Sequence, residues 1–402
     1  MIAERVDFRI APDLEAHLKS LRVKAGVIGL IFLVLTFIGA FVDNTQFFRS
    51  YLWSYVFWLG MSLGCMAWLM TQYLTGGAWG VMIRRIAESA SQTLPVWLIL
   101  FIPLIFGIQA LYGNSWGNPN TVAHDAVLQH RAPYLNTTFW IIRAAVYLVG
   151  WCLLSFLLNK WSGREDREGG VSPREHMAVI SAPGLIFWAF SVTFMATDWV
   201  MSVNPHWYST MFGLIFIAGQ GLSAISFMIA VIVMLSKYEP MASLITRRHM
   251  RDLGTLALAN VMFFAYLSFS QFLITWAGNL PDEIVWYKHR LTGTWWTLGL
   301  ILVFVHFALP FCLLLSQDLK RNFKSIRAVA IMLIIARMVG VYWETVPEFY
   351  PAGQFHLSWL DFTAPIGFGG LFIALFLTNL MKRPLIPPNN PKLEEALAHG
   401  RK

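Results

Sequence analysis

The sequence predicts an all-α integral membrane protein with ten transmembrane helices. Only 13% of its 402 residues are charged, 57% are hydrophobic, and the mean hydropathy is +0.56. A soluble domain carries about 25% charged residues, so this chain has too few to cover a solvated surface and is expected to face lipid. Apolar runs of bilayer-spanning length recur along the chain, and Lys and Arg gather in alternate connections between them.

A helix needs about 20 mainly apolar residues to cross the hydrocarbon layer. The runs that meet this requirement predict spans at 25–42, 51–74, 94–112, 138–158, 180–198, 209–235, 254–276, 294–316, 327–345 and 359–381. Pro103 and Pro183 are expected to mark a kink or an end in the third and fifth spans, because membrane helices tolerate proline. We expect a cytoplasmic N-terminal segment (1–24), a membrane domain (25–381) and a cytoplasmic C-terminal tail (382–402).

The connections differ sharply in basic charge. The two termini and every second connection hold 23 Lys and Arg residues, against 4 in the connections on the other side. Cytoplasmic loops carry an excess of this kind, so both termini are expected in the cytoplasm. The same signal accounts for the net charge of +8, and lipid rather than nucleic acid is the expected partner.

The order of the helices allows spans 2–5 to correspond to spans 6–9. Spans 2–5 and 6–9 are offset by an even number, so corresponding helices cross the membrane in the same direction. Two parallel four-helix bundles are therefore possible, with the first and tenth helices outside them. Asp198 and Glu344 occupy matching positions, each at the outer end of a span that runs outward. Acids at these positions suit either a proton exit or a solvated helix end.

An ionisable side chain at the centre of the bilayer costs about 2.5–3.5 kcal/mol of insertion free energy, so each one is expected to have a structural or functional role. The candidates are Arg143 in the fourth span, Asp198 in the fifth, His306 in the eighth, Arg337 and Glu344 in the ninth, and Asp361 at the outer start of the tenth. Arg337 must be paired or hydrated, because arginine stays charged in proteins. Glu344 follows it by two turns on the same face, so the two form either a polar stripe toward the outer surface or, alternatively, a structural tie and a separate interfacial acid.

His306 is the only histidine well inside a predicted span. A membrane b-type haem held by two histidines needs one on each of two helices, so this chain alone cannot build that site. The haem-containing cytochrome b and haem–copper oxidase classes are thereby excluded. Either a hydrogen-bonded core histidine or a proton relay fits His306.

The outer turn 196–210 crowds Asp198, His206 and three aromatic residues into a short segment. Such a turn suits a quinol headgroup, a soluble partner, or an ordinary interfacial aromatic hairpin. The three cysteines, Cys65, Cys152 and Cys312, lie in apolar runs without a CxxC pair. We expect no zinc or iron–sulfur site in this chain.

Five stretches carry a resemblance to a known family. Segments 196–210, 268–283 and 306–311, together with 359–361 and the glycine-rich 367–370, resemble the ActF subunit of bacterial alternative complex III. The motifs are long, occur in the same order and run from the fifth span to the tenth, while the first half matches in its helix layout.

The resemblance implies an NrfD/PsrC-like membrane subunit of a quinol:cytochrome c, or other electron acceptor, oxidoreductase in a bacterial inner membrane, serving respiration or photosynthesis. It implies partner subunits that hold the redox centres: an NrfD-like quinol-binding subunit, an iron–sulfur subunit, and multihaem and monohaem cytochrome c subunits. This chain would bind no redox cofactor alone and would contribute a proton path or a quinol-adjacent surface. Asp198, His206, His306, Arg337, Glu344 and Asp361 are the candidate residues for that role.

One position departs from the family. Members often have an aspartate shortly after the arginine that matches Arg337, where this chain has Gly340. A proton path here would have to use Glu344 or a water molecule instead. Two alternative functions stay open from the residues: a secondary transporter, and a scaffold subunit without chemistry of its own.

Overall fold

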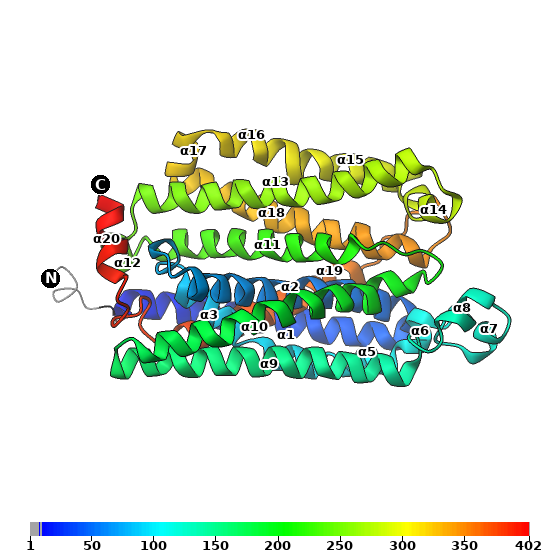
Figure 1. Cartoon of the computed structure of the whole chain (residues 1–402), viewed down its shortest axis with the longest axis horizontal. Helices are drawn as coiled ribbons and strands as arrows, with labels where there is room; N and C mark the ends of the chain where they lie inside the picture. The colour runs from blue at the N-terminus through cyan, green and yellow to red at the C-terminus, as the bar shows by residue number, and fades with distance from the viewer. Residues whose placement is uncertain (1–7, 9, 402) are drawn as a thin grey trace.

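The computed structural model describes residues 8 and 10–401, and within them the chain is helical and has no strand. As predicted, ten of the described helices are long and apolar enough to cross a membrane. The ten spans are α1 (Pro12–Val42), α2 (Asn44–Thr75), α3 to α5 (Arg84–Phe106), α9 (Thr137–Glu168), α10 with η3 and η4 (Ser172–Val203), α11 (Phe212–Leu235), α13 (Arg247–Gly278), α15 with η5 and α16 (Gly293–Leu315), α18 with η6 (Phe323–Phe349) and α19 (Leu360–Leu380). They lie side by side along the long axis of the molecule (Figure 1).

Short helices connect the spans at both ends. At the end where α1 begins and the chain finishes lie η2 (Ala78–Gly80), α12 (Met241–Leu244), α17 (Gln317–Arg321) and α20 (Leu393–Arg401). At the opposite end lie α6 (Ile108–Tyr112), α7 (Pro119–Ala123), α8 (Ala126–Arg131) and α14 (Pro281–Arg290). We call these the terminal end and the loop end, at the left and right of Figure 1.

Side-chain caps fix where several spans begin. Asp43, Asn136 and Asn322 precede α2, α9 and α18, and each side chain accepts a hydrogen bond from a backbone amide of the first turn. Thr246 caps α13 in the same way. These oxygens satisfy amides that have no partner within the helix, so each helix starts at a defined residue.

The third span lies at Arg84–Phe106 instead of the predicted 94–112, and it is divided into short helices. The chain there forms α3 (Arg84–Ser91), α4 (Leu94–Leu100), α5 (Ile102–Phe106) and α6, broken at Thr93, Phe101 and Gly107. Helix α3 is buried along its whole length, although residues 75–93 were assigned to a basic loop. Proline near the start of α4 and α5 removes a backbone donor, which is one physical cause of such breaks.

Both terminal segments contain helix among the described residues. Of the predicted N-terminal segment, residues 1–7 and 9 lie outside the described residues, and α1 already begins at Pro12. The C-terminal tail, described as far as residue 401, packs Leu385, Ile386 and Leu393 into the interior and ends in α20.

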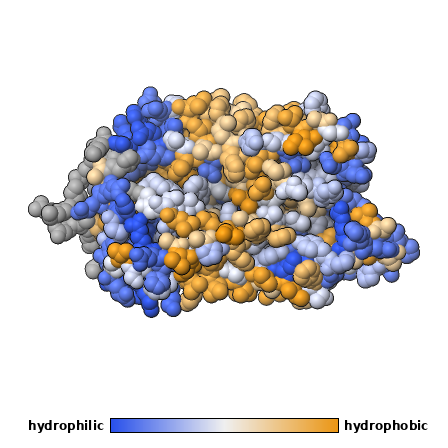
Figure 2. All heavy atoms as spheres, in the orientation of Figure 1, coloured by the Kyte–Doolittle hydropathy of each residue, from blue (hydrophilic) through white to orange (hydrophobic). Residues whose placement is uncertain are grey.

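Helices α2 and α11 form the centre of the molecule. Of their most apolar windows, 89% and 83% of residues are buried, against 17% for α1 and for α13. Helix α10 and the third span pack against α2, and α9 packs against both of them, whereas α13, α15–α16 and α18 pack together beside α11. On the face that Figure 2 shows, a broad hydrophobic band crosses the middle of the molecule, with hydrophilic residues at both ends. That distribution matches a bilayer surrounding the central band.

Helix α1 is held mainly by a close contact with α19. A Cβ atom on Gly370 would lie 2.4 Å from the Gly29 Cα atom, and one on Gly29 would lie 2.6 Å from the Leu371 backbone nitrogen. The two backbones touch because both positions are glycine. Small residues allow this kind of packing between membrane helices.

Candidate functional site

The carboxylate of Asp198 is fully buried and lies in a shell of donors near the loop end. Arg143 from α9 binds it through two nitrogens, with Nε 2.8 Å from Oδ2 and Nη2 2.9 Å from Oδ1. The hydroxyls of Tyr134 and Tyr147 each donate to it at 2.9 Å. Burial raises the pKa of Tyr134, which keeps this hydroxyl a donor. We call Asp198 with these three residues the Asp198 centre.

Asp198 lies on a π-helical turn rather than on regular α-helix. The turn, η3, spans Ala196–Val200 at the end of α10. A second π-helical turn, η5 (Val303–Ala308), interrupts the eighth span and carries His306. Such turns often occur at functional sites. Two of the six residues selected from the sequence therefore lie on the least regular parts of their helices.

Arg337 and Glu344 form the bidentate ion pair that their spacing allowed. Arg337 Nη1 lies 2.6 Å from Glu344 Oε1, and Nη2 lies 2.9 Å from Oε2. The guanidinium also stacks near the rings of Phe216 and Phe264, at 5.3 and 5.2 Å. A Cβ on Gly219 of α11 would meet Arg337 Nε at 2.4 Å, so this glycine makes room for the pair.

His306 is 4% exposed and packs against Phe264, with the ring centroids 4.5 Å apart. Its Nε2 atom is buried and has no hydrogen-bond partner among the described residues. Phe264 therefore touches both His306 and Arg337, which brings helices α13, α18 and the η5 turn together. A buried polar atom without a partner needs an explanation, and an ordered water is the usual one. We call His306, Arg337 and Glu344 the His306 centre.

Asp361 forms a third, separate centre at the start of α19. It is 5% exposed and accepts hydrogen bonds from Ser50 at 2.7 Å, Trp53 at 3.1 Å and the Ser358 amide at 2.9 Å. Gln46 donates to it at 3.4 Å. In contrast to Asp198 and Glu344, Asp361 forms no ion pair with any described residue.

His206 lies apart from all three centres. Its side chain is 54% exposed, and its Nε2 lies 2.7 Å from Asp125 Oδ2 in the connection that carries α7 and α8. The sequence placed His206 beside Asp198, and the intervening turn separates them: Asp198 faces the interior, whereas His206 faces outward.

The Asp125 carboxylate gives a local prediction about pH. It caps α8 by accepting hydrogen bonds from the Val127 and Leu128 amides. The hydrogen bond from Leu128 is the main cause that lowers the pKa of Asp125 below 3.8, and the hydrogen bond with His206 lowers it further. A lowered folded-state pKa adds stability that is complete above pH 3.8 and is lost as the pH falls through the folded value. Amide exchange of α8, normalised to the intrinsic rate, should therefore accelerate below that pH.

The matched control is Asp125→Asn, which keeps an acceptor at the N-cap but cannot titrate. We expect its normalised exchange to stay flat across the same pH range. An equal acceleration in the wild type and the variant would contradict the assignment to Asp125.

A surface cavity of about 290 Å³ opens beside the Asp198 centre at the loop end. Tyr134, which donates to Asp198, forms part of its wall, as do Thr197 and Ser202 of the turn 196–210. His130 and Arg131 add polar groups, so the cavity combines donors with apolar walls.

The sequence missed a buried charge network at the terminal end. We call it the terminal-end network; its members are Arg84, Arg85, Glu88, Ser162, Glu165, Asp166 and Arg383. Arg84 Nε lies 2.8 Å from Glu88, Arg85 Nη1 lies 2.5 Å from the same carboxylate, and these two arginines also pair with Glu165 and Asp166 respectively. Arg84 and Arg85 are each 2% exposed, so assigning them to a basic loop was wrong.

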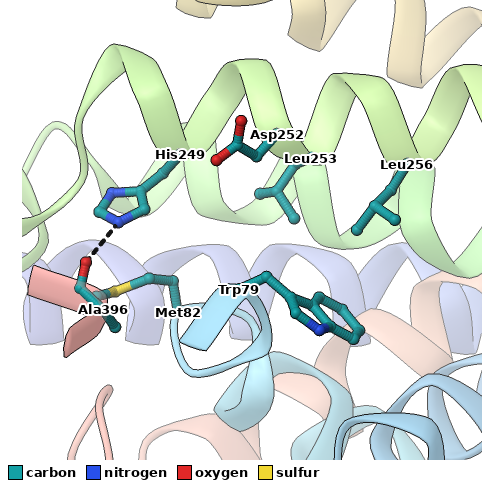
Figure 3. A pocket seen from close by; sticks show the side chains of 7 residues that line it. All are labelled: Trp79, Met82, His249, Asp252, Leu253, Leu256 and Ala396. Atoms are coloured by element: carbon teal, nitrogen blue, oxygen red, sulfur yellow. Dashed lines mark hydrogen bonds between the residues drawn. The ribbon is translucent and has the colours of Figure 1, made fainter. Parts of the chain in front are cut away.

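A second, smaller cavity of about 20 Å³ lies between η2, α13 and α20, as Figure 3 shows. His249 points toward α20, and its Nε2 lies 3.1 Å from the Ala396 carbonyl oxygen. Its Nδ1 accepts from the Thr246 amide, so Nε2 is the donor to Ala396. The space holds about one water molecule, and the contact joins the C-terminal tail to α13.

No group of three His, Cys, Asp or Glu side chains with metal-binding geometry occurs among the described residues. The chain matches no protein-family model, and no curated protein sequence matches it significantly.

Proposed function

We propose that this chain is a membrane subunit of a quinol-oxidising complex that passes electrons to cytochrome c or another acceptor. In this proposal it resembles the ActF subunit of alternative complex III, lies in a bacterial inner membrane with both termini in the cytoplasm, and holds no redox centre. Its own contribution is a proton path. The iron–sulfur and haem c centres and the main quinol site belong to partner subunits.

One observation carries the proposal: His306 lies within a membrane span beside a buried ion pair, with an unpartnered nitrogen. Ionisable groups inside a membrane span are costly and commonly belong to ion or proton pathways. With Gly340 where the family often has an acid, Glu344 is the carboxylate that is paired with Arg337.

The packing supports a division of the spans into two four-helix bundles, with α1 and α19 flanking them. The first bundle would contain the Asp198 centre and the second the His306 centre. Each matching acid, Asp198 and Glu344, is held by an arginine of its own bundle. The cavity beside Tyr134 would connect the first bundle to water at the loop end.

His306→Ala is expected to lower quinol-driven proton release of the assembled complex by about tenfold or more, since a positioned proton-transfer group contributes at least that much. Subunit composition should stay unchanged. The measurement is pH-indicator absorbance in proteoliposomes during turnover. His206→Ala is the matched control, because that histidine is exposed and lies outside the three centres. Wild-type proton release in His306→Ala would favour a scaffold subunit.

A secondary transporter is the second candidate, because the third span is divided into short helices. Transporters commonly bind substrate at such breaks. Substrate-dependent flux in proteoliposomes that contain this chain alone would favour transport. Its absence, together with redox partners in the purified complex, would favour the first proposal.

A further inference from the structure

The terminal end carries two groups of cations that are neutralised differently. In the terminal-end network, three arginines meet three carboxylates inside the protein. The second group lies where α13, α17 and α18 meet, and we call it the basic cluster. Its members are Arg247, Arg248, Arg251, Lys320, Arg321, Lys324 and Arg327. Residues 247–252 and 318–327, which hold all seven cations, contain only two acids, Asp252 and Asp318.

The basic cluster has few acidic partners among the described residues. Arg251 pairs with Asp252 at 3.0 Å. The other six cations form no ion pair with a described residue. In Figure 2 the hydrophilic residues at the upper left lie where Figure 1 places α17. An excess of cations at one site raises its electrostatic energy unless an anion binds.

Lys320 shows that the cluster is more than a solvated surface. Its side chain is 6% exposed and packs against Gly254, where a Cβ would meet Lys320 Cγ at 2.8 Å. Among the described residues the Lys320 ammonium donates one hydrogen bond, to Thr255 Oγ1 at 3.2 Å, although an ammonium has three donors. Burial, and after it the charge of Arg251, lower the pKa of Lys320. An incoming anion would stabilise this cation.

Arg248 extends the same site along α13. It precedes Thr255 by seven residues, which places the two on one face of the helix. Its Nε atom is buried and has no hydrogen-bond partner among the described residues. Lys320 and Arg248 therefore both have N–H groups without a hydrogen-bond acceptor among the described residues.

The surface next to the cluster faces lipid. Leu315 at the end of α16 is 56% exposed, and only 17% of the most apolar window of α13 is buried. Helix α13 has 32 residues, about 48 Å at 1.5 Å per residue, so its charged first turns extend beyond a hydrocarbon layer of about 30 Å. The cluster therefore lies at headgroup level beneath an apolar face.

We propose that the basic cluster binds the phosphate of an anionic phospholipid whose acyl chains lie along α13 and α16. The phosphate oxygens accept from Lys320 and Arg248, and Arg321 and Lys324 add attraction from the surface. This lipid site does not depend on the proposed electron-transfer function.

The test measures lipid binding to the purified full chain by native mass spectrometry, with phosphatidylglycerol, phosphatidylcholine and inorganic phosphate as probes. The wild type should bind phosphatidylglycerol selectively. Arg248→Gln/Lys320→Gln should weaken that binding by about 30-fold, because each cation near an anionic surface contributes about fivefold. Arg321→Gln/Lys324→Gln should weaken phosphatidylglycerol binding to a similar extent. Because this variant changes exposed residues, it still tests the site if the first variant does not fold.

Lys160→Gln/Arg164→Gln is the control, because it removes two cations from the same end on α9. It should leave phosphatidylglycerol binding within about twofold of wild type, since the removed charges lie on another helix. Equal weakening by the control would overturn a specific site. Equal binding of phosphatidylcholine, or displacement of the lipid by inorganic phosphate at equal concentration, would overturn the anionic phospholipid as its ligand.

Discussion

Arg143→Met is expected to lower the free energy of unfolding by about 3–5 kcal/mol, because it leaves Asp198 buried without its cation. The two partners are 9% and 0% exposed at the side chain, so water cannot replace the lost interaction. Tyr134 and Tyr147 still donate, but neutral donors do not balance the charge. The measurement is reversible unfolding in mixed detergent micelles, followed by tryptophan fluorescence.

Two further variants make this result specific. Arg143→Met/Asp198→Leu removes both charges and should recover most of the lost stability, because a buried pair replaced by apolar groups is often neutral overall. Lys392→Met breaks the ion pair with Glu395, whose side chains are 41% and 59% exposed. Exposed pairs contribute about 0–1 kcal/mol, so this variant should stay near wild type. Equal losses in Arg143→Met and Lys392→Met would contradict the account of the Asp198 centre.

Gly370→Ala is expected to cost about 3 kcal/mol, at the upper end of the usual range for overpacking. The new Cβ would lie 2.4 Å from Gly29 Cα and 2.6 Å from the Ala25 carbonyl oxygen. Both obstacles are backbone, so no side chain can rotate away and α1 must move off α19. Thermal unfolding, with disulfide crosslinking between cysteines introduced on the two helices, reports both effects.

Gly26→Ala is the matched control on the same helix pair. Its Cβ would lie 3.6 Å from Ala374 Cβ, an ordinary contact. Alanine also favours helix over glycine by about 1 kcal/mol, so this variant should match or exceed wild-type stability. If both glycine variants behaved alike, the close contact between α1 and α19 would not explain how α1 is held.

Hydropathy predicted ten spans because the thickness of the bilayer directly sets the length of an apolar run. It placed the start of the third span at residue 94 instead of Arg84, because α3 carries two buried arginines that read as loop residues. Arg84 and Arg85 resemble loop cations until Glu165 and Asp166, some 80 residues away, are placed beside them. A long-range ion pair of this kind leaves no periodic signal in the sequence.

The candidate site also combines a contact that is local in sequence with contacts that only the fold creates. Arg337 and Glu344 share one helix, so their spacing alone placed them on one face, and in the structure they form an ion pair. Arg143 and Asp198 are 55 residues apart on different helices, and only the fold brings them together. Likewise, Asp198 and His206 are neighbours in sequence, yet the π-helical turn and the loop after it direct them to different surroundings. The roles of these residues in proton transfer stay predictions.

The most direct test of the central claim is to isolate this chain from its native membrane through an affinity tag on the C-terminus. Mass spectrometry and haem spectroscopy would then identify what accompanies it, and quinol oxidation would be assayed in the same sample. The account predicts a stable complex that contains haem c and iron–sulfur subunits and reduces cytochrome c, or another acceptor, with quinol. A stable lone polypeptide, without redox partners or quinol oxidation, would contradict it.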